Sequence, residues 1–438
     1  MKTRLLATIL AIVSAVLIVR AVDIHVDSAA VAGGDGSSAT PYNTFAQGLA
    51  AAESGDTILV HGDAGQTYTD YPYAVWQTNL TVAAVGTGRP LFSVTANAIT
   101  NWDSAVFVVS APGFRLAHVD FYGTPEKCSC EYSAIVQFYD DADNGIVEGC
   151  AFNWSTKNTV KMGWNIRGDK ATNIVVRGNV FTNHRSQYSN GTVVCLGDHA
   201  RVIGNVFTNM QTAARLGDYG VVVSNTVVNS NSAIGALLNG KTTQNRSALI
   251  AFNTAVQSNG ANNPAIWKSR EGLTAVVASA PTRIHNNTVV GSTHFIRCEK
   301  SDYNASHWGP VIVNNIALCT STNIVDVSTS IHTNQYTGSG LSAFITDTII
   351  QNNILTSDLD VIFEDRVTLL CSDNVDDNLE RDVAFCDTVD LDSDRYFAPD
   401  VLEKPYINAG YGTAQNGYPR YIGAKPADVP LSTILTIR

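Results

Sequence analysis

Charged residues end six short segments that recur through the middle of the chain. Aligned on their first residues, the segments are IRGD (166–169), CLGD (195–198), RLGD (215–218), LNGK (238–241), WKSR (267–270) and RCEK (297–300). Their fourth positions hold Asp169, Asp198, Asp218, Lys241, Arg270 and Lys300. Three acids are therefore followed by three bases, one in each segment.

Like charges on neighbouring strands repel one another, so each half of this column predicts a ligand. Strands lie ~4.8 Å apart, and three carboxylates at that spacing suit a hard cation such as Ca²⁺. We therefore predict a calcium site at Asp169, Asp198 and Asp218. The three bases favour an anionic ligand, such as a uronate or a sulfate. The alternative is a set of solvated turn residues, with salt bridges where the column changes sign.

A second recurring phrase predicts the strands that position these charges. Its copies are VEGCAF (147–152), VRGNVF (176–181), VIGNVF (202–207), VVSNTV (222–227), IAFNTA (250–255), IHNNTV (284–289), IVNNIA (312–317) and IQNNIL (350–355). The phrase is β-branched and alternating, and its copies follow at intervals of 20 to 38 residues with no helical pattern between them. Parallel strands with one copy per coil stack into a parallel β-helix of about a dozen coils.

The Asn in this phrase has a predicted structural role. Asn tolerates the left-handed conformation needed where the chain turns after a strand. Asn side chains at one position in successive coils can also hydrogen-bond to one another as a ladder. The predicted ladder is Asn179, Asn205, Asn225, Asn253, Asn287, Asn315 and Asn353.

The two ends of the chain differ from the repeat. Lys2 and Arg4 precede an apolar run, which is typical of a signal peptide, here 1–21, and no later membrane span is expected. Residues 22–438 are then one β-helix domain. Its cap, about 22–68, contains a short helix that Asn43 caps, with Phe45 and Leu49 on one face and an end near Gly55. The net charge of −11 is concentrated in an acidic C-terminal segment, about 358–438.

Export makes the eight cysteines candidates for disulfides. Three groups lie close enough in sequence for local bridges: Cys128, Cys130 and Cys150; Cys298 and Cys319; Cys371 and Cys386. Cys195 lies within an apolar strand and is expected to be a buried thiol. No basic stripe supports nucleic-acid binding, and we expect a secreted, periplasmic or cell-surface monomer.

Two stretches resemble a known group of proteins. The opening VD…GGDGSS…PYNTFAQGLAAAESGDTILV and the close KPYINAGYG…PRYIGA (404–424) are similar to those of secreted bacterial right-handed parallel β-helix proteins of the pectate-lyase-like superfamily. The resemblance implies an all-β, right-handed solenoid with a short N-terminal capping helix. Many members are polysaccharide lyases, which implies Ca²⁺-assisted β-elimination on a uronic-acid-containing polysaccharide.

The basic segments supply candidate catalytic groups for such a lyase. These are Lys241, Lys268, Arg270, Arg297 and Lys300, with Lys268 or Lys300 as the base and Arg270 and Arg297 holding carboxylate or sulfate. Trp267, Trp308, His294 and His307 are candidate substrate-binding residues beside them, whereas Trp154 and Trp164 are expected to pack. The paired-Asp, Gly-His-Gly and Arg-Ile-Lys set of polygalacturonases does not occur.

Two other functional classes are compatible with this sequence. One is a non-catalytic glycan-binding or adhesive β-helix, because a fold does not dictate a function. The other is a glycoside hydrolase, which needs two carboxylates at catalytic separation.

Overall fold

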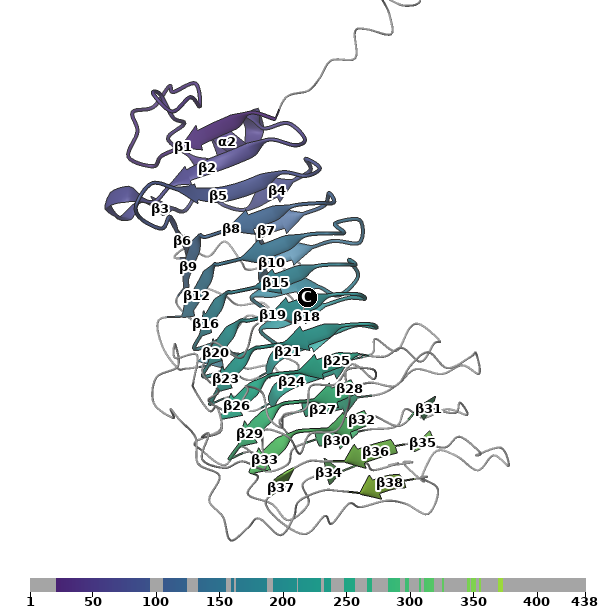
Figure 1. The fold of residues 1–438 in the computed structure, drawn as a ribbon. Coiled ribbons are helices and arrows are strands. Elements are labelled where there is room, and N and C mark those ends of the chain that lie inside the picture. The colour runs from purple at the N-terminus through teal and green to yellow at the C-terminus, as the bar shows by residue number, and fades with distance from the viewer. Residues whose placement is uncertain are drawn as a thin grey trace, which may run out of the picture.

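The chain folds as a stack of parallel strands, seen in a computed structural model (Figure 1). The structure describes residues 21–94, 105–123, 133–154, 159–160, 163–186, 192–210, 212–229, 232–237, 248–256, 266–269, 283–291, 296–298, 307–308, 311–318, 325–326, 345–346, 348–351, 354–355 and 369–372. Three long sheets run along the stack, and most of the described coils contribute one strand to each sheet in turn. The β-helix predicted from the repeat, with about a dozen coils, is therefore confirmed.

Sheet A contains thirteen strands. In spatial order these are β1 (Asp23–Val26), β2 (Thr57–His61), β5 (Thr81–Val85), β8 (Arg115–Ala117), β11 (Ile146–Glu148), β15 (Val175–Arg177), β19 (Arg201–Ile203), β22 (Val221–Val223), β25 (Leu249–Ala251), β28 (Arg283–His285), β32 (Val311–Val313), β36 (Thr348–Gln351) and β38 (Leu369–Ser372).

Sheet B contains eleven strands and follows sheet A within each coil. They are β3 (Thr67–Tyr68), β6 (Leu91–Val94), β9 (Asp120–Gly123), β12 (Ala151–Trp154), β16 (Val180–Thr182), β20 (Val206–Thr208), β23 (Thr226–Val228), β26 (Thr254–Val256), β29 (Thr288–Val290), β33 (Ile316–Leu318) and β37 (Ile354–Leu355).

Sheet C contains ten strands and completes each coil. They are β4 (Tyr73–Val75), β7 (Ala105–Val109), β10 (Ala134–Phe138), β14 (Ile166–Gly168), β18 (Val194–Leu196), β21 (Thr212–Leu216), β24 (Ser232–Leu237), β27 (Ile266–Ser269), β30 (Ile296–Cys298) and β34 (Val325–Asp326). Two strand pairs lie outside these sheets: β13 (Thr159–Val160) with β17 (Arg185–Ser186), and β31 (His307–Trp308) with β35 (Ile345–Thr346).

Alternation along each strand creates the core, because successive side chains point to opposite faces of a sheet. One inward position of sheet B stacks aromatic rings from coil to coil, with ring centroids 4.8–5.5 Å apart in the series Phe92, Phe121, Phe152, Phe181 and Phe207. Strand pairing in sheet B sets these rings in the same register position in successive coils.

The Asn ladder forms between sheets A and B. Each Asn donates its side-chain N–H to the side-chain oxygen of the Asn in the next coil at 3.0 Å, which links Asn179, Asn205, Asn225, Asn253, Asn287 and Asn315. Asn353 lies outside the described residues. The expected backbone reason was wrong: the left-handed residue is the one before each ladder Asn, such as Gly178, Gly204 or Ser224.

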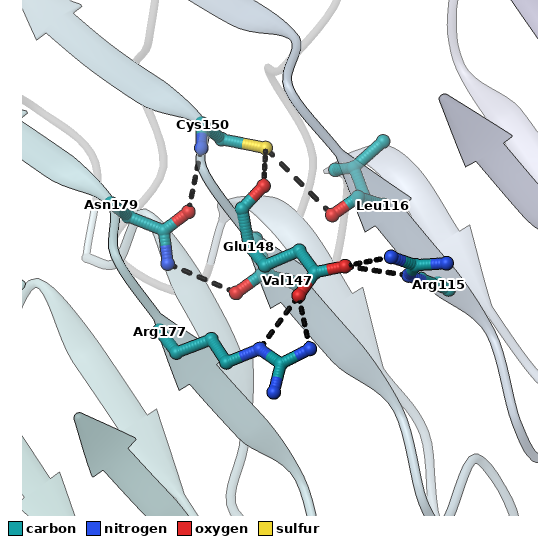
Figure 2. A network of polar contacts seen from close by, with 7 residues as sticks. All are labelled: Arg115, Leu116, Val147, Glu148, Cys150, Arg177 and Asn179. Carbon is teal, nitrogen blue, oxygen red and sulfur yellow. Dashed lines mark hydrogen bonds and ion pairs between the residues drawn. The ribbon is translucent and has the colours of Figure 1, made fainter. Parts of the chain in front are cut away.

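Cys150 occupies the ladder position one coil before Asn179. Its backbone N–H donates to Asn179 Oδ1 at 2.8 Å, and its buried thiol donates to the carbonyl oxygens of Leu116 and Glu148 (Figure 2). The predicted participation of Cys150 in a local disulfide is therefore wrong, since the thiol is free. Cys195, as predicted, is a buried free thiol. The other six cysteines are outside the described side chains.

The N-terminal end is closed by α2 (Phe45–Ala51), with a 3-10 turn, η1 (Asp63–Gly65), after β2. Phe45 and Leu49 are buried, as predicted. The cap is Thr44 rather than Asn43, because the Thr44 hydroxyl accepts from the Gln47 N–H at 3.3 Å. In the described part of the chain, no helix has the length and apolarity needed to cross a bilayer.

Candidate functional site

One outward position of sheet C carries charged, polar and aromatic residues in successive coils. Strand pairing aligns Ala74, Val108, Gln137, Arg167, Cys195, Arg215, Gly235, Trp267, Arg297 and Asp326 in this position. We call this set the sheet C column. The residues on either side of Arg215, Ala214 and Leu216, are buried in the core, so the Arg215 position lies on the outer face.

Arg167 is held in place by contacts on its own coil. Its guanidinium lies over the Trp164 ring, 4.5 Å from the centroid, and its Nε donates to Asp169 Oδ1 at 2.9 Å. Its side chain is only 15% exposed. Cation–π contact and a charge-assisted hydrogen bond together fix this guanidinium rather than leaving it open to a ligand. Trp164 is buried, which confirms its predicted packing role.

Arg215 differs from Arg167 in having no ion pair among the described residues. Its side chain is half-buried, and it forms no ion pair with any residue that the structure describes. Arg215 is two coils from Arg167, which corresponds to ~10 Å along the stack at the usual strand spacing. On its other side the column continues with Gly235, which has no side chain.

Cys195 lies between the two arginines. Burial raises the pKa of its thiol to about 11, so the group is neutral at pH 7. It packs with Ala134 and Trp164 in a small apolar cluster of buried residues. A neutral thiol does not compensate the charge of Arg215.

The predicted column of three acids does not form. Strand pairing sets Gly168 opposite Leu196, so Asp169 is one residue out of step with Asp198 and is bound to Arg167 instead. Asp198 and Asp218 do occupy equivalent positions, and Asp198 Oδ1 accepts the Asp218 backbone N–H at 2.9 Å. Within the described residues no three His, Cys, Asp or Glu side chains gather into a metal site. Asp169 is therefore not aligned with Asp198 and Asp218 as the predicted calcium site expects.

The predicted alignment of the basic segments is partly correct. Trp267 pairs with Arg297, as the alignment of WKSR with RCEK expects. LNGK was three residues out of step, because Arg215 pairs with Gly235 rather than with Leu238. Lys268 shares a register position with Ala236 and Leu216, and Leu216 is buried in the core.

The remaining predicted residues divide into two groups. Lys241, Arg270, His294 and Lys300 lie outside the described residues. His307 and Trp308 form β31, which pairs with β35 and belongs to none of the three long sheets; Figure 1 draws both strands beside the stack. Sequence reasoning missed Arg167 and Arg215, although both stand in the quoted segments IRGD and RLGD.

A second arginine cluster lies on the outer face of sheet A. Figure 2 shows Glu148 between Arg115 and Arg177, which come from the coils on either side. The carboxylate accepts from Arg115 Nε and from Arg177 Nε, each at 2.6 Å. Burial alone would raise the pKa of Glu148, but the hydrogen bonds and charges of the two arginines hold it below its usual value. Both oxygens are used, so this cluster binds the coils together.

Comparison with known proteins bears on the fold alone. No family model matches the sequence, and no curated protein matches it. Among solved structures, pectate lyase Pel9A superposes with a TM-score of 0.56 at 16% identity, covering 93% of this chain and 96% of that one. A rhamnogalacturonan lyase gives 0.53 at 11% identity, covering 84% and 91%. The GH136 lacto-N-biosidase from Eubacterium ramulus gives 0.51 at 11% identity, covering 81% and 67%.

These similarities, with the parallel pairing of every strand that the structure describes, define the class of protein. The chain is a right-handed parallel β-helix with the fold of pectate lyase and of other polysaccharide lyases. The same fold is shared by a glycoside hydrolase, so the comparisons do not select one reaction.

Proposed function

We propose that the protein cleaves a uronic-acid-containing polysaccharide by β-elimination. The observation that supports this most strongly is Arg215, a guanidinium on the outer face of sheet C without an ion pair in the described part of the chain. Guanidinium binds carboxylate through two parallel hydrogen bonds, which makes Arg215 a receptor for an anionic sugar. Trp267 and Arg297 share its column and extend the proposed surface toward the C-terminal coils.

The proposed reaction uses the arginine as an electrostatic catalyst. A base removes the proton from C5 of the uronate, and the electron pair forms the C4–C5 double bond. The bond from C4 to the glycosidic oxygen then breaks, and that oxygen leaves with a proton. Arg215 stabilises the negative charge that develops on the carboxyl group as the C5 proton leaves. No co-reactant is needed, because the proton removed and the proton gained balance.

For the base we propose Lys300, which follows Arg297 by three residues. A lysine among arginines has a lowered pKa and can accept a proton near neutral pH. Lys268, the other predicted base, shares its register with core positions and is the weaker proposal. Arg270 and Lys241 stay proposed anion-binding residues. A calcium requirement remains a prediction, and the proposed scheme contains no step through a metal.

A glycoside hydrolase is the second candidate. It is favoured by Asp198 and Asp218, two carboxylates at equivalent positions on neighbouring coils at the end of sheet C strands. One strand spacing is ~4.8 Å, near the separation of about 5–5.5 Å typical of retaining glycosidases. We also propose that residues 1–21 direct export, since polymeric substrates of this kind are extracellular.

The test is a product analysis on purified full-length protein. Polygalacturonate, alginate, chondroitin and hyaluronan are incubated with and without EDTA, and new reducing ends and ultraviolet absorbance of unsaturated uronate are followed together. A lyase raises both signals on at least one polymer. Reducing ends without absorbance indicate a hydrolase, and retention on a polysaccharide column with neither signal indicates a binding protein. Absence of new absorbance on every uronate polymer contradicts the lyase proposal.

A further inference from the structure

Two histidines meet on the first coils of sheet A, on a different sheet from the proposed catalytic column. His25 belongs to β1 and His61 ends β2, and both side chains are half-buried. Nδ1 of His25 lies 3.1 Å from Nε2 of His61, with the ring planes inclined by 48°. The parallel pairing of β1 with β2, residue by residue from Asp23–Thr57 to Val26–Val60, fixes the backbone under both rings.

Two imidazole nitrogens at this separation match adjacent ligands of one transition metal ion. Metal–imidazole bonds of ~2.0–2.1 Å at angles of about 90–110° separate the two nitrogens by roughly 2.8–3.4 Å. We propose that His25 and His61 bind a divalent first-row ion of the nickel, copper and zinc group, the ions that imidazole prefers. Water would complete the coordination, since no third protein ligand stands with them in the described part of the chain.

The protonation and charge of the pair agree with a metal site. Burial and the neighbouring His61 lower the pKa of His25, against the effect of Asp23. Asp23 on β1 and Asp63 after β2 add negative charge nearby, which favours a cation.

The position of the pair gives such an ion a structural consequence. β1 is the edge strand of sheet A, and an open edge is the weak point of a long sheet. An ion held by His25 and His61 would cross-link β1 to β2 across 36 residues of sequence. Because the unfolded chain lacks the paired geometry, binding would stabilise the folded cap by mass action.

The test uses Ni²⁺ as the probe on the full-length protein, with excess Mg²⁺ present to occupy carboxylate sites. Isothermal titration calorimetry compares the wild type with His25→Gln, His61→Gln and the control His199→Asn, an exposed histidine on another corner of the stack. Circular dichroism verifies that each variant is folded, and the Ni²⁺-induced shift in melting temperature is measured in parallel.

We expect the wild type and His199→Asn to bind one equivalent of Ni²⁺. In His25→Gln and in His61→Gln the affinity for this equivalent should fall by at least ~10-fold, a factor that changes around a metal ligand commonly reach. The Ni²⁺-induced rise in melting temperature should disappear in the same two variants. The proposal is overturned if the wild type binds no Ni²⁺, or if either single variant keeps the equivalent with a smaller loss of affinity. If one variant does not fold, the other decides by the same criterion.

Discussion

Two outer faces of the same stack carry an arginine on either side of a central residue, with opposite results. On sheet A, Glu148 stands between Arg115 and Arg177 and binds both. On sheet C, Cys195 stands between Arg167 and Arg215. Burial keeps the Cys195 thiol neutral, so it neutralises neither arginine. One central residue therefore separates a structural ion cluster from a surface able to receive an anion.

The difference also shows how a β-helix can place function on one face. Coils repeat the same backbone, so each outer face can carry charge at the same spacing. The two faces differ in whether their arginines have an ion-pair partner within the protein. Burying Glu148 costs free energy because its carboxylate loses water. The ion pairs with Arg115 and Arg177 offset that cost.

The largest expected effect is the loss of activity in Arg215→Ala. A charge-assisted hydrogen bond to carboxylate is worth about 1.5–3 kcal/mol, so kcat/KM on the active polymer should fall by roughly 10- to 100-fold. Arg177→Ala, the matched change on sheet A, should leave kcat/KM as in the wild type. Initial rates at low substrate concentration measure both. Equal losses in the two variants would remove the distinction between the faces.

The second prediction converts sheet C to the arrangement of sheet A. Cys195→Asp inserts a carboxylate beside Arg215, and an internal ion pair should compete with the substrate and lower kcat/KM by about 10-fold. Cys195→Ser keeps the centre neutral and should stay close to wild type. A fall in Cys195→Ser as large as in Cys195→Asp would show that the charge is not the cause.

The third prediction dissolves the sheet A cluster. Glu148→Gln leaves Arg115 and Arg177 without their anion, and both arginines are about half exposed, so water can solvate them. The free energy of unfolding should therefore fall by only about 1–2 kcal/mol, measured by urea denaturation, with kcat/KM unchanged. A fall in kcat/KM in Glu148→Gln while the variant remains folded would mean that sheet A also takes part in catalysis.

The smallest expected effect is the pH dependence of the stability difference between the wild type and Glu148→Gln. The pKa of Glu148 is lower in the folded than in the unfolded protein, so its stabilising effect is present above its unfolded pKa and is lost as pH falls through the folded one. The stability gap between wild type and Glu148→Gln should therefore be constant at neutral pH and shrink below about pH 4. Urea midpoints across this range check it, and a gap that widens in acid contradicts the assignment.

The fold could be predicted because the repeated Asn indicates both the corner of each coil and the stacking of one coil on the next. Each ladder Asn marks the same corner of each coil, and its side-chain hydrogen bonds need that position in every coil. The number of residues between corners varies, yet the ladder is insensitive to that variation.

The site could be predicted only in part, because strand register is set by backbone pairing rather than by motif. The Gly197 N–H donates to the Gly168 carbonyl, which moves Asp169 one residue away from Asp198 and allows Asp169 to reach Arg167. The motif RLGD does not point to Arg215, because the residue that it shares with its neighbours is the Asp at its end. Which face an arginine occupies follows from the burial of its neighbours, here Ala214 and Leu216, which the sequence does not report.

The most direct test of the central claim is a crystal structure of the protein with an oligouronate bound. We expect a carboxylate of the sugar to lie within hydrogen-bonding distance of the Arg215 guanidinium on the outer face of sheet C. Arg115 and Arg177 should still be bound to Glu148. An oligouronate seated on the Arg115–Glu148–Arg177 cluster of sheet A, with Arg215 free of the ligand, would contradict it.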